Sequence, residues 1–414
     1  MKKLELYIHI PFCVRKCDYC DFLSAPAGRN QQEKYFHALE QEIQHFPISF
    51  SGHGHTGKLI SDKEDYTVTS VFFGGGTPSI VPGEWIAGLL DLMRIHFPFD
   101  RNAEISIECN PGTVDEEKLR TYRSAGVNRL SLGLQSADNR ELELLGRIHT
   151  WEDFLRTFET AEEAGFSNIN VDLMSALPGQ TAASWETTLR KVLELRPQHI
   201  SAYSLIIEEG TPFFDVYGED ARVREAGGIP QLLPSEDEER EMYRMTEVLL
   251  SGAGMHRYEI SNYALPGYEC RHNTGYWNGT EYAGFGLGAS SLLEMSERKK
   301  GDENKKVRVR MKNTDEMQTY LMHAGDSDGC VYKDCDMLLY QDQMEEFMFL
   351  GLRMMRGISE TDFQKRFGRT VEEVYGGVIR RQMEQGLLQR KGERILLTDK
   401  GTDLSNMVMA DFLF

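Results

Sequence analysis

The stretch that decides the fold is Ile8-His9-Ile10-Pro11-Phe12-Cys13-Val14-Arg15-Lys16-Cys17-Asp18-Tyr19-Cys20. Its cysteines follow a C-x3-C-x2-C spacing and place three thiolates in one loop. A structural zinc site is tetrahedral and takes four protein ligands, and an ordinary [4Fe–4S] site takes four cysteines. Asp18 or His9 would complete a zinc site, and a chance grouping is the remaining alternative. The spacing favours a cluster with one metal corner open to a small molecule.

Strand-like and helix-like segments alternate from the N-terminus to about residue 207. Short β-rich runs predict strands, and longer segments with an apolar period of 3.6 residues predict helices. Strands that alternate with helices form a parallel sheet with right-handed crossovers. Six such units predict an α/β fold, an open, partial (β/α)6 barrel of TIM type. The predicted strands are 4–10, 68–73, 104–108, 129–134, 168–173 and 199–206, and two of the predicted helices are 31–46 and 114–125.

Polar residues stand where these strands end, which is where the reactive groups of such a barrel lie. They are the cysteine loop, the segment 74–77, Glu108, Gln135 and Asp172. Consecutive glycines let the backbone approach a ligand closely and offer N–H groups to a carboxylate. A single polar strand end is more often a cap or a loop residue. Five of them together predict a ligand site at the barrel mouth.

Composition and charge exclude several classes of protein. The chain has 414 residues, 40% of them hydrophobic, and a formal net charge of −19. Nucleic-acid binding depends on clustered Lys and Arg, so this charge argues against a nucleic-acid partner. No stretch approaches 18 apolar residues, so we expect no transmembrane segment. The seven cysteines form no disulfide framework, which suits a reducing cytoplasm.

The cysteine loop and its flanks resemble the radical S-adenosylmethionine (SAM) family. Tyr7 precedes the first cysteine, Tyr19 precedes the last, and Gly-Gly-Gly-Thr-Pro at 74–78 follows the next strand. The resemblance implies a [4Fe–4S] cluster whose open iron binds SAM. Carried over by position, it implies Cys13, Cys17 and Cys20 as cluster ligands, and as SAM or cluster contacts Tyr7, Tyr19, Gly75, Gly76, Thr77, Glu108, Gln135, Arg147, Asp172 and Ile206.

Two further features separate branches within this family. Over nearly its whole length the chain resembles the oxygen-independent coproporphyrinogen III oxidase group, which continues the cysteine motif as C-x2-C-x-C. Here Phe22 replaces that additional cysteine, and His272-Asn273-Thr274-Gly275-Tyr276-Trp277 matches the H-N-x-x-Y-W motif of HemW-type haem chaperones. Resemblance to that subgroup implies that the chain binds haem and delivers it to haemoproteins, respiratory ones included. Where the recipient is a membrane protein, delivery implies transient contact with it. SAM turnover stays open in this prediction, as does the choice between an enzyme and a chaperone.

The motif also carries the haem candidates. His272 is a chemically suitable axial ligand, because neutral imidazole is a common donor to haem iron, and Tyr276 and Trp277 suit the faces of a macrocycle. A single histidine beside aromatic residues is, however, more often a hydrogen-bonded packing residue. Cys270 is an alternative donor, although a buried, inert thiol is the commoner case. The competing function is the SAM-dependent oxidative decarboxylation of coproporphyrinogen III.

The last hundred residues read as a separate unit. Helices predicted at 343–355 and 371–385, followed by a strand near 395–397, indicate a winged-helix-like α+β domain, which the resemblance identifies as HemN-type. Residues 294–312 are charged and predict a solvent-exposed hairpin or loop. We therefore predict a radical SAM barrel at 1–235, a barrel-closing segment with the H-N-x-x-Y-W motif and a glycine-rich stretch at 236–312, and the C-terminal domain at 313–414. Both a monomer and a dimer fit this sequence.

Overall fold

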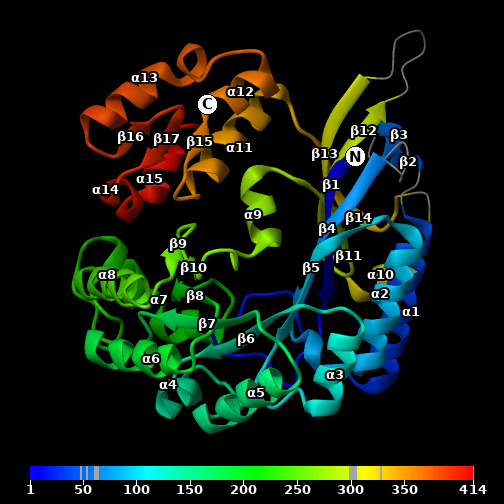
Figure 1. The fold of residues 1–414 in the computed structure, drawn as a ribbon, viewed down its shortest axis with the longest axis horizontal. Coiled ribbons are helices and arrows are strands. Elements are labelled where there is room, and N and C mark those ends of the chain that lie inside the picture. Colours follow the sequence, from blue (N-terminus) through cyan, green and yellow to red (C-terminus); the bar gives the residue numbers. More distant parts are fainter. Residues whose placement is uncertain (47–48, 53–54, 60–64, 298–304, 327–328, 414) are drawn as a thin grey trace.

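A computed structural model describes residues 1–46, 49–52, 55–59, 65–297, 305–326 and 329–413. Within these ranges the strands form one 14-stranded sheet and one three-stranded sheet. The large sheet and its helices make up most of the molecule, and the small sheet belongs to a compact C-terminal unit (Figure 1). In the same ranges no helix is long and apolar enough to cross a membrane.

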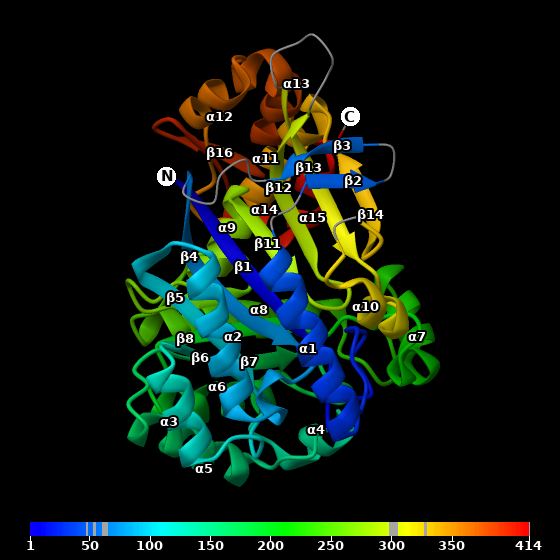
Figure 2. The ribbon, with the colours of Figure 1, turned by 90° about the vertical axis from the view of Figure 1, so that its right-hand side faces the viewer.

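Six parallel strands form the centre of the large sheet and neighbour one another in chain order. All six strands predicted from the sequence are present, with ends that differ by a few residues. Helices follow most of these strands and cover the outer face of the sheet (Figures 1 and 2). The strands are β1 (Lys2–Ile10), β4 (Tyr66–Gly75), β5 (Phe99–Cys109), β6 (Arg129–Gln135), β7 (Ile169–Ser175) and β8 (His199–Ser204). The helices are α1 (Arg29–His45), α2 (Gly83–His96), α3 (Glu116–Ser124), α4 (Asn139–Leu144), α5 (Trp151–Glu163), α6 (Ala182–Glu194), α7 (Pro212–Glu225) and α8 (Glu236–Gly252), and a short 3-10 turn, η2, spans Pro78–Ile80.

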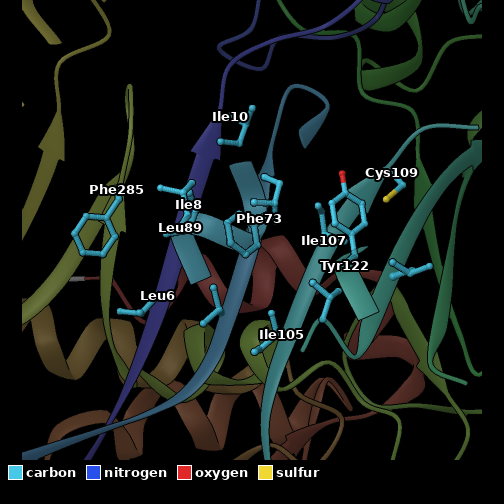
Figure 3. Packing of buried hydrophobic residues seen from close by; sticks show 14 of the residues in the cluster. Leu6, Ile8, Ile10, Phe73, Leu89, Ile105, Ile107, Cys109, Tyr122 and Phe285 are labelled. Atoms are coloured by element: carbon cyan, nitrogen blue, oxygen red, sulfur yellow. The ribbon is translucent and has the colours of Figure 1, made fainter. Parts of the chain in front are cut away.

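The alternation of residues along β1 separates the core from the barrel interior. Leu6 and Ile8 are fully buried and pair in register with Val71 and Phe73 of β4. Figure 3 shows Leu6, Ile8 and Phe73 packed on the helix-covered face, together with Leu89 of α2. Burying one such aliphatic side chain contributes roughly 1.5–3 kcal/mol. Because successive side chains of a strand point to opposite faces, the polar residues between them face the inside of the barrel.

The sheet is open, as the sequence predicts. Among the described residues β1 and β8 do not pair, so the hydrogen-bonded ladder never closes on itself. Beyond β8 the sheet continues with two short antiparallel strands, and beyond β1 with one parallel and then several antiparallel strands. These outer strands are β9 (His256–Arg257), β10 (Asn262–Ala264), β11 (Glu281–Phe285), β12 (Ser290–Glu297), β13 (Lys305–Asn313) and β14 (Tyr332–Met337), and a hairpin of β2 (Ser49–Gly52) and β3 (His55–Leu59) pairs with β12.

One expectation about this edge was partly wrong. The charged segment 294–312 contains consecutive antiparallel strands, β12 and β13, as expected of a hairpin, but this hairpin belongs to the main sheet and one side of it is buried. Met295, Val309 and Met311 alternate with the charged residues and are buried. The glycine-rich segment after residue 281 likewise extends the sheet from β1, whereas we expected it to seal the open side.

The C-terminal unit has its own core and the winged-helix-like order of elements that the sequence predicts. Met344 and Met348 are buried in this core with aromatic residues such as Phe363. Helix α9 (Arg271–Asn278), which carries the H-N-x-x-Y-W motif, lies between this unit and the barrel (Figure 1). The remaining elements are α10 (Met317–His323), α11 (Tyr340–Leu352), β15 (Ile358–Ser359), α12 (Glu360–Phe367), α13 (Val371–Glu384), β16 (Leu388–Lys391), β17 (Arg394–Leu397), α14 (Asp399–Asp403) and α15 (Ser405–Ala410).

Candidate functional site

The three cysteines lie in the loop between β1 and α1, at the carboxyl mouth of the barrel. All three are free thiols and partly accessible. The base of the loop is tied by a bridge between Phe12 and Ala25, and the amide of Cys20 donates to the carbonyl of Cys17 at 3.2 Å. Within the described ranges no three His, Cys, Asp or Glu side chains converge as metal ligands. The loop therefore brings the thiols to one mouth of the barrel without drawing them around a single point.

The end of β4 lies directly against this loop. Gly75 has a φ of +117°, and a Cβ there would stand 2.7 Å from the ring of His9. A Cβ on Gly76 would stand 2.7 Å from the carbonyl oxygen of Phe12. Thr77 is buried, and its hydroxyl is 3.5 Å from the Cys13 sulfur. Glycine is therefore required at both positions for the strand end to reach the cysteine loop.

Glu108, at the end of β5, faces the same glycine turn. Its Oε2 accepts a hydrogen bond from the Gly75 amide at 3.2 Å. Burial, and then the nearby charge of Asp172, raises the pKa of Glu108 to about 8. The ring of Tyr7 also borders this turn, because a Cβ on Gly74 would stand 3.1 Å from it. Glu108 is thus a carboxyl group that exchanges its proton near neutral pH at the barrel mouth.

Arg147 connects the strand ends to the cysteine loop from the turn after α4. Its guanidinium donates to Asn110 Oδ1 at 2.8 Å, to the Gly133 carbonyl, and to the Cys17 sulfur at 3.7 Å. Burial alone would lower the pKa of Arg147, but Tyr19 and Cys17 raise it, so the group stays charged. Its Nε is buried and has no acceptor among the described residues. A buried donor of this kind suits an anionic ligand.

The other four predicted contact residues are Asp172, Gln135, Tyr19 and Ile206. Asp172 accepts hydrogen bonds from Ser131 at 3.0 Å and Asn170 at 2.8 Å, and burial raises its pKa. Gln135 ends β6 with a φ of +72°, a left-handed conformation that non-glycine residues rarely adopt. Tyr19, in contrast, packs its edge against Phe213. Ile206 follows the end of β8 and is 67% exposed.

Sequence reasoning missed two residues that organise the mouth. Asn110 donates to the Thr77 hydroxyl at 2.9 Å and accepts from Arg147. His9 bonds the Tyr7 hydroxyl through Nδ1 at 3.1 Å and the Leu23 carbonyl through Nε2 at 2.9 Å, which holds the far side of the cysteine loop. Two features of the sequence could have identified these residues: Asn110 stands just beyond a strand, and His9 lies on the interior face of β1.

The opposite mouth of the barrel is closed by α9. Glu104, near the middle of β5, accepts the backbone N–H groups of Arg271 and His272 at 3.0 and 3.3 Å and the thiol of Cys270 at 3.4 Å. A carboxylate at a helix N-terminus satisfies its free N–H groups and complements its dipole. A Cβ on Gly275 would collide with the Glu5 carboxyl group, so this glycine lets the helix settle onto the barrel floor.

His272 is enclosed in this closed mouth. The side chain is 1% exposed, and its Nδ1 and Nε2 lie 2.9 Å from the Ser70 hydroxyl and 3.1 Å from the Tyr276 hydroxyl. Burial and then Arg129 lower the pKa of His272 to about 3, so the ring is neutral. Both ring nitrogens are therefore engaged, and a haem iron would have to displace one of these partners.

Trp277 lies at the outer end of the motif. The guanidinium of Arg353 sits 4.3 Å from the centre of its ring, and the indole N–H is buried without an acceptor among the described residues.

Comparisons with known proteins agree with this architecture. The sequence model of the Radical SAM superfamily matches residues 7–192, and that of the HemN C-terminal domain matches residues 338–404. The solved structure of coproporphyrinogen III oxidase (HemN) from Escherichia coli, described as a radical SAM enzyme, superposes with a TM-score of 0.76 over 99% of this chain and 90% of that one, at 23% identity. The likeness confirms the radical SAM fold with its C-terminal domain.

Curated relatives decide between the branches of that fold. Heme chaperone HemW of Bacillus subtilis strain 168 is 34% identical over 408 residues, which cover 98% of both chains. Heme chaperone HemW of E. coli strain K12 is 38% identical over 286 residues, 69% of each chain. This chain belongs to the HemW family. The resemblance to HemW-type proteins, which Phe22 and the H-N-x-x-Y-W motif indicated, is thereby confirmed, and the HemW chain places that motif on α9, away from the cysteine loop.

Proposed function

We propose that this HemW chain binds haem and delivers it to haemoproteins in a reducing cytoplasm, and that it also holds a [4Fe–4S] cluster and SAM. The observation that carries the proposal is the pairing, on one barrel, of a three-thiol loop at one mouth with the H-N-x-x-Y-W helix at the other. Whole-length similarity to proteins named Heme chaperone HemW supports the haem function. Phe22, in place of a further cysteine, disfavours the oxidase alternative.

The residues at the cysteine mouth fit the cluster and SAM. Cys13, Cys17 and Cys20 would supply three thiolate ligands, and the missing fourth ligand would leave one iron for SAM. When bound, the cluster supplies a metal ion that the amino and carboxylate groups of SAM can chelate. The Gly75–Gly76 backbone would then approach the ligand closely, and the free Nε of Arg147 would meet a carboxylate.

The remaining contacts would position the rest of SAM. In the ionised state Glu108 and Asp172 would accept hydrogen bonds from the amino N–H groups or the ribose hydroxyls, because a charged acceptor makes the stronger hydrogen bond. Tyr7 and Tyr19 would flank SAM or the cluster. Gln135 and Ile206 complete the predicted set from the ends of β6 and β8.

The haem candidates remain His272, Tyr276 and Trp277. Ligation by His272 would require its ring to leave Ser70 or Tyr276, so we expect haem binding to be coupled to movement of α9. Tyr276 and Trp277 would then supply aromatic faces for the macrocycle.

A haem titration beside an enzyme assay tests the proposal. Anaerobically reconstituted protein should bind added haem with a shifted Soret band and should not convert coproporphyrinogen III. A His272→Ala variant, checked for native unfolding behaviour, should retain haem less well, and an unchanged spectrum and affinity would remove His272 from the site. Robust formation of protoporphyrinogen, without haem binding, would establish the oxidase function instead.

A further inference from the structure

A cavity that is separate from the cysteine mouth lies between α9, β13 and the C-terminal unit. It has a volume of about 400 Å³. Trp277 of the H-N-x-x-Y-W motif and Phe347 of α11 line it, together with four arginines, Arg308, Arg356, Arg366 and Arg394. These four arginines are called the arginine pocket below. Such a concentration of cationic groups is unexpected in a chain whose formal net charge is −19.

Two of the arginines have a structural role at the end of α9. Arg308 donates to the Gly279 carbonyl at 2.7 Å, and Arg356 donates to Asn278 Oδ1 at 2.7 Å. Cations at a helix C-terminus stabilise it through the helix dipole. This role explains why Arg308 and Arg356 stand here, but it accounts for neither of the other two.

Arg366 and Arg394 come from the C-terminal unit and bring additional charge to the same place. A Cβ on Gly279 would stand 3.2 Å from Nη1 of Arg366 and 3.7 Å from Nη1 of Arg308, so these two guanidinium groups converge on one residue. Arg394 donates only to the carbonyl of Gly357 among the hydrogen bonds of the described residues, at 3.3 Å. Like charges held this close favour the arrival of an anion.

Two carboxylates, Glu346 and Asp362, also line the cavity, but among the described residues neither forms an ion pair within 4.0 Å with one of its four arginines. Glu346 is bonded to Arg310 at 2.8 Å, and Asp362 lies 3.9 Å from Lys365. Burial, and then repulsion from Arg308, lowers the pKa of Arg366 to about 10, so the group is still charged at neutral pH. The indole N–H of Trp277 adds a buried donor without an acceptor.

A larger cavity of mixed lining lies beside the arginine pocket. Its volume is about 720 Å³, and it shares Asn278 and Arg356 with the arginine pocket. Met354 and Met355 supply apolar surface there, beside polar and charged residues such as Glu5. Thioether side chains adapt to flat apolar ligands, and each of the two volumes lies in the range of small-molecule sites, roughly 300–1,000 Å³.

We infer that the arginine pocket binds the two propionate carboxylates of a tetrapyrrole, with the macrocycle extending past Trp277 toward the methionine-lined cavity. The inference rests on the proposed haem function and gives it a second anchor, distinct from any iron ligand. Guanidinium groups suit carboxylates because each offers a planar pair of donors. The site therefore selects free propionate groups on its ligand.

Haem titration of the full chain tests this inference through both the protein and the ligand. The Arg366→Gln/Arg394→Gln double variant should bind haem about tenfold or more weakly, since a hydrogen bond to a charged group carries roughly a tenfold effect. Haem dimethyl ester, which lacks free carboxylates, should bind the wild type as weakly as haem binds the variant and should be insensitive to the substitutions. Arg120→Gln on the exposed outer helix α3 is the matched control and should leave haem affinity unchanged.

The outcomes separate this inference from the proposed function. Haem binding by the wild type with equal affinity in the double variant would overturn the arginine pocket and leave the haem function standing. Absence of haem binding by the wild type would overturn both. Competition by millimolar inorganic pyrophosphate, together with unimpaired binding of the dimethyl ester, would identify a phosphate site and overturn the tetrapyrrole assignment. The unfolding midpoint of the double variant should match that of the wild type, because among the described residues Arg366 and Arg394 make no ion pair and Arg394 donates to one backbone carbonyl.

Discussion

The two mouths of the barrel are built from the same strands but differ in how their polar groups are satisfied. At the carboxyl mouth, Arg147 keeps a buried Nε without an acceptor, and Gln135 holds a left-handed backbone conformation. At the amino mouth, Glu104 and His272 are buried with several hydrogen-bond partners each. Unmet donors and strained backbone persist where a ligand is expected to complete the structure. The carboxyl mouth thus presents its unmet donor beside the cysteine loop, whereas the amino mouth is covered by α9, whose outer end carries the indole N–H of Trp277, unpaired among the described residues.

The largest expected effect is on stability at the closed mouth. Glu104→Ala should lower the free energy of unfolding by about 3–5 kcal/mol. The substitution leaves the backbone N–H groups of Arg271 and His272 without an acceptor and removes a carboxylate that neighbours the buried Arg129. Denaturant unfolding measures this. Glu116→Ala on the exposed face of α3 is the control and should stay within about 0.5 kcal/mol. A loss below 1 kcal/mol for Glu104→Ala would mean that α9 does not depend on this carboxylate.

At the cysteine mouth the same kind of change should affect binding as well as stability. Arg147→Gln should weaken SAM binding to reconstituted protein by about 2 kcal/mol, or roughly 30-fold, by removing a charged hydrogen-bond donor. Its unfolding free energy should fall by about 1–3 kcal/mol, less than for Glu104→Ala, because Asn110 and the Gly133 carbonyl lose a charged donor. Calorimetry with SAM and denaturant unfolding give the two values. Strong destabilisation with unchanged SAM affinity would make Arg147 a structural residue.

A pH titration sharpens the contrast at Glu108. Because its pKa is raised to about 8, Glu108 is protonated in much of the free protein at pH 7. Only the carboxylate offers a charged acceptor to the amino N–H groups or ribose hydroxyls of SAM, so SAM affinity should rise about tenfold between pH 6.5 and 8.5. Glu108→Gln should remove this rise, and a variant that keeps it would show that another group titrates.

The stability effect of Glu108 has the opposite sign to its binding effect. The raised pKa favours the folded state fully below pH 4.5, and this contribution is lost as the pH rises toward 8. Wild-type stability should therefore fall over this range more steeply than that of Glu108→Gln, which carries no titrating group at the position.

The smallest expected effect concerns backbone strain. Gln135→Gly should stabilise the protein by about 0.5–1 kcal/mol, because glycine adopts a φ of +72° without the steric cost that glutamine bears. SAM affinity should fall slightly at the same time if the side chain contacts SAM. Thermal unfolding beside a SAM titration resolves the two effects, and a destabilised variant would show that the glutamine side chain supports the fold.

The sequence predicted the architecture more fully than the site. β-rich runs and strand-helix order located all six barrel strands, because these patterns depend on local geometry. Contacts between distant segments left weaker signals, so the roles of Asn110 and His9 were missed although both hold the cysteine loop in place. The burial of segment 294–312 was misjudged because its charged residues hide the buried residues that alternate with them, and burial depends on the neighbouring strands.

The central claim is that three thiolates hold an iron–sulfur cluster with one iron reserved for SAM. The EPR spectrum of anaerobically reconstituted, reduced protein tests it most directly. We expect the signal of a [4Fe–4S] cluster that changes when SAM is added and that is lost when Cys13, Cys17 and Cys20 are replaced by Ala. A protein without such a signal, or with one that SAM leaves unchanged, would contradict this account.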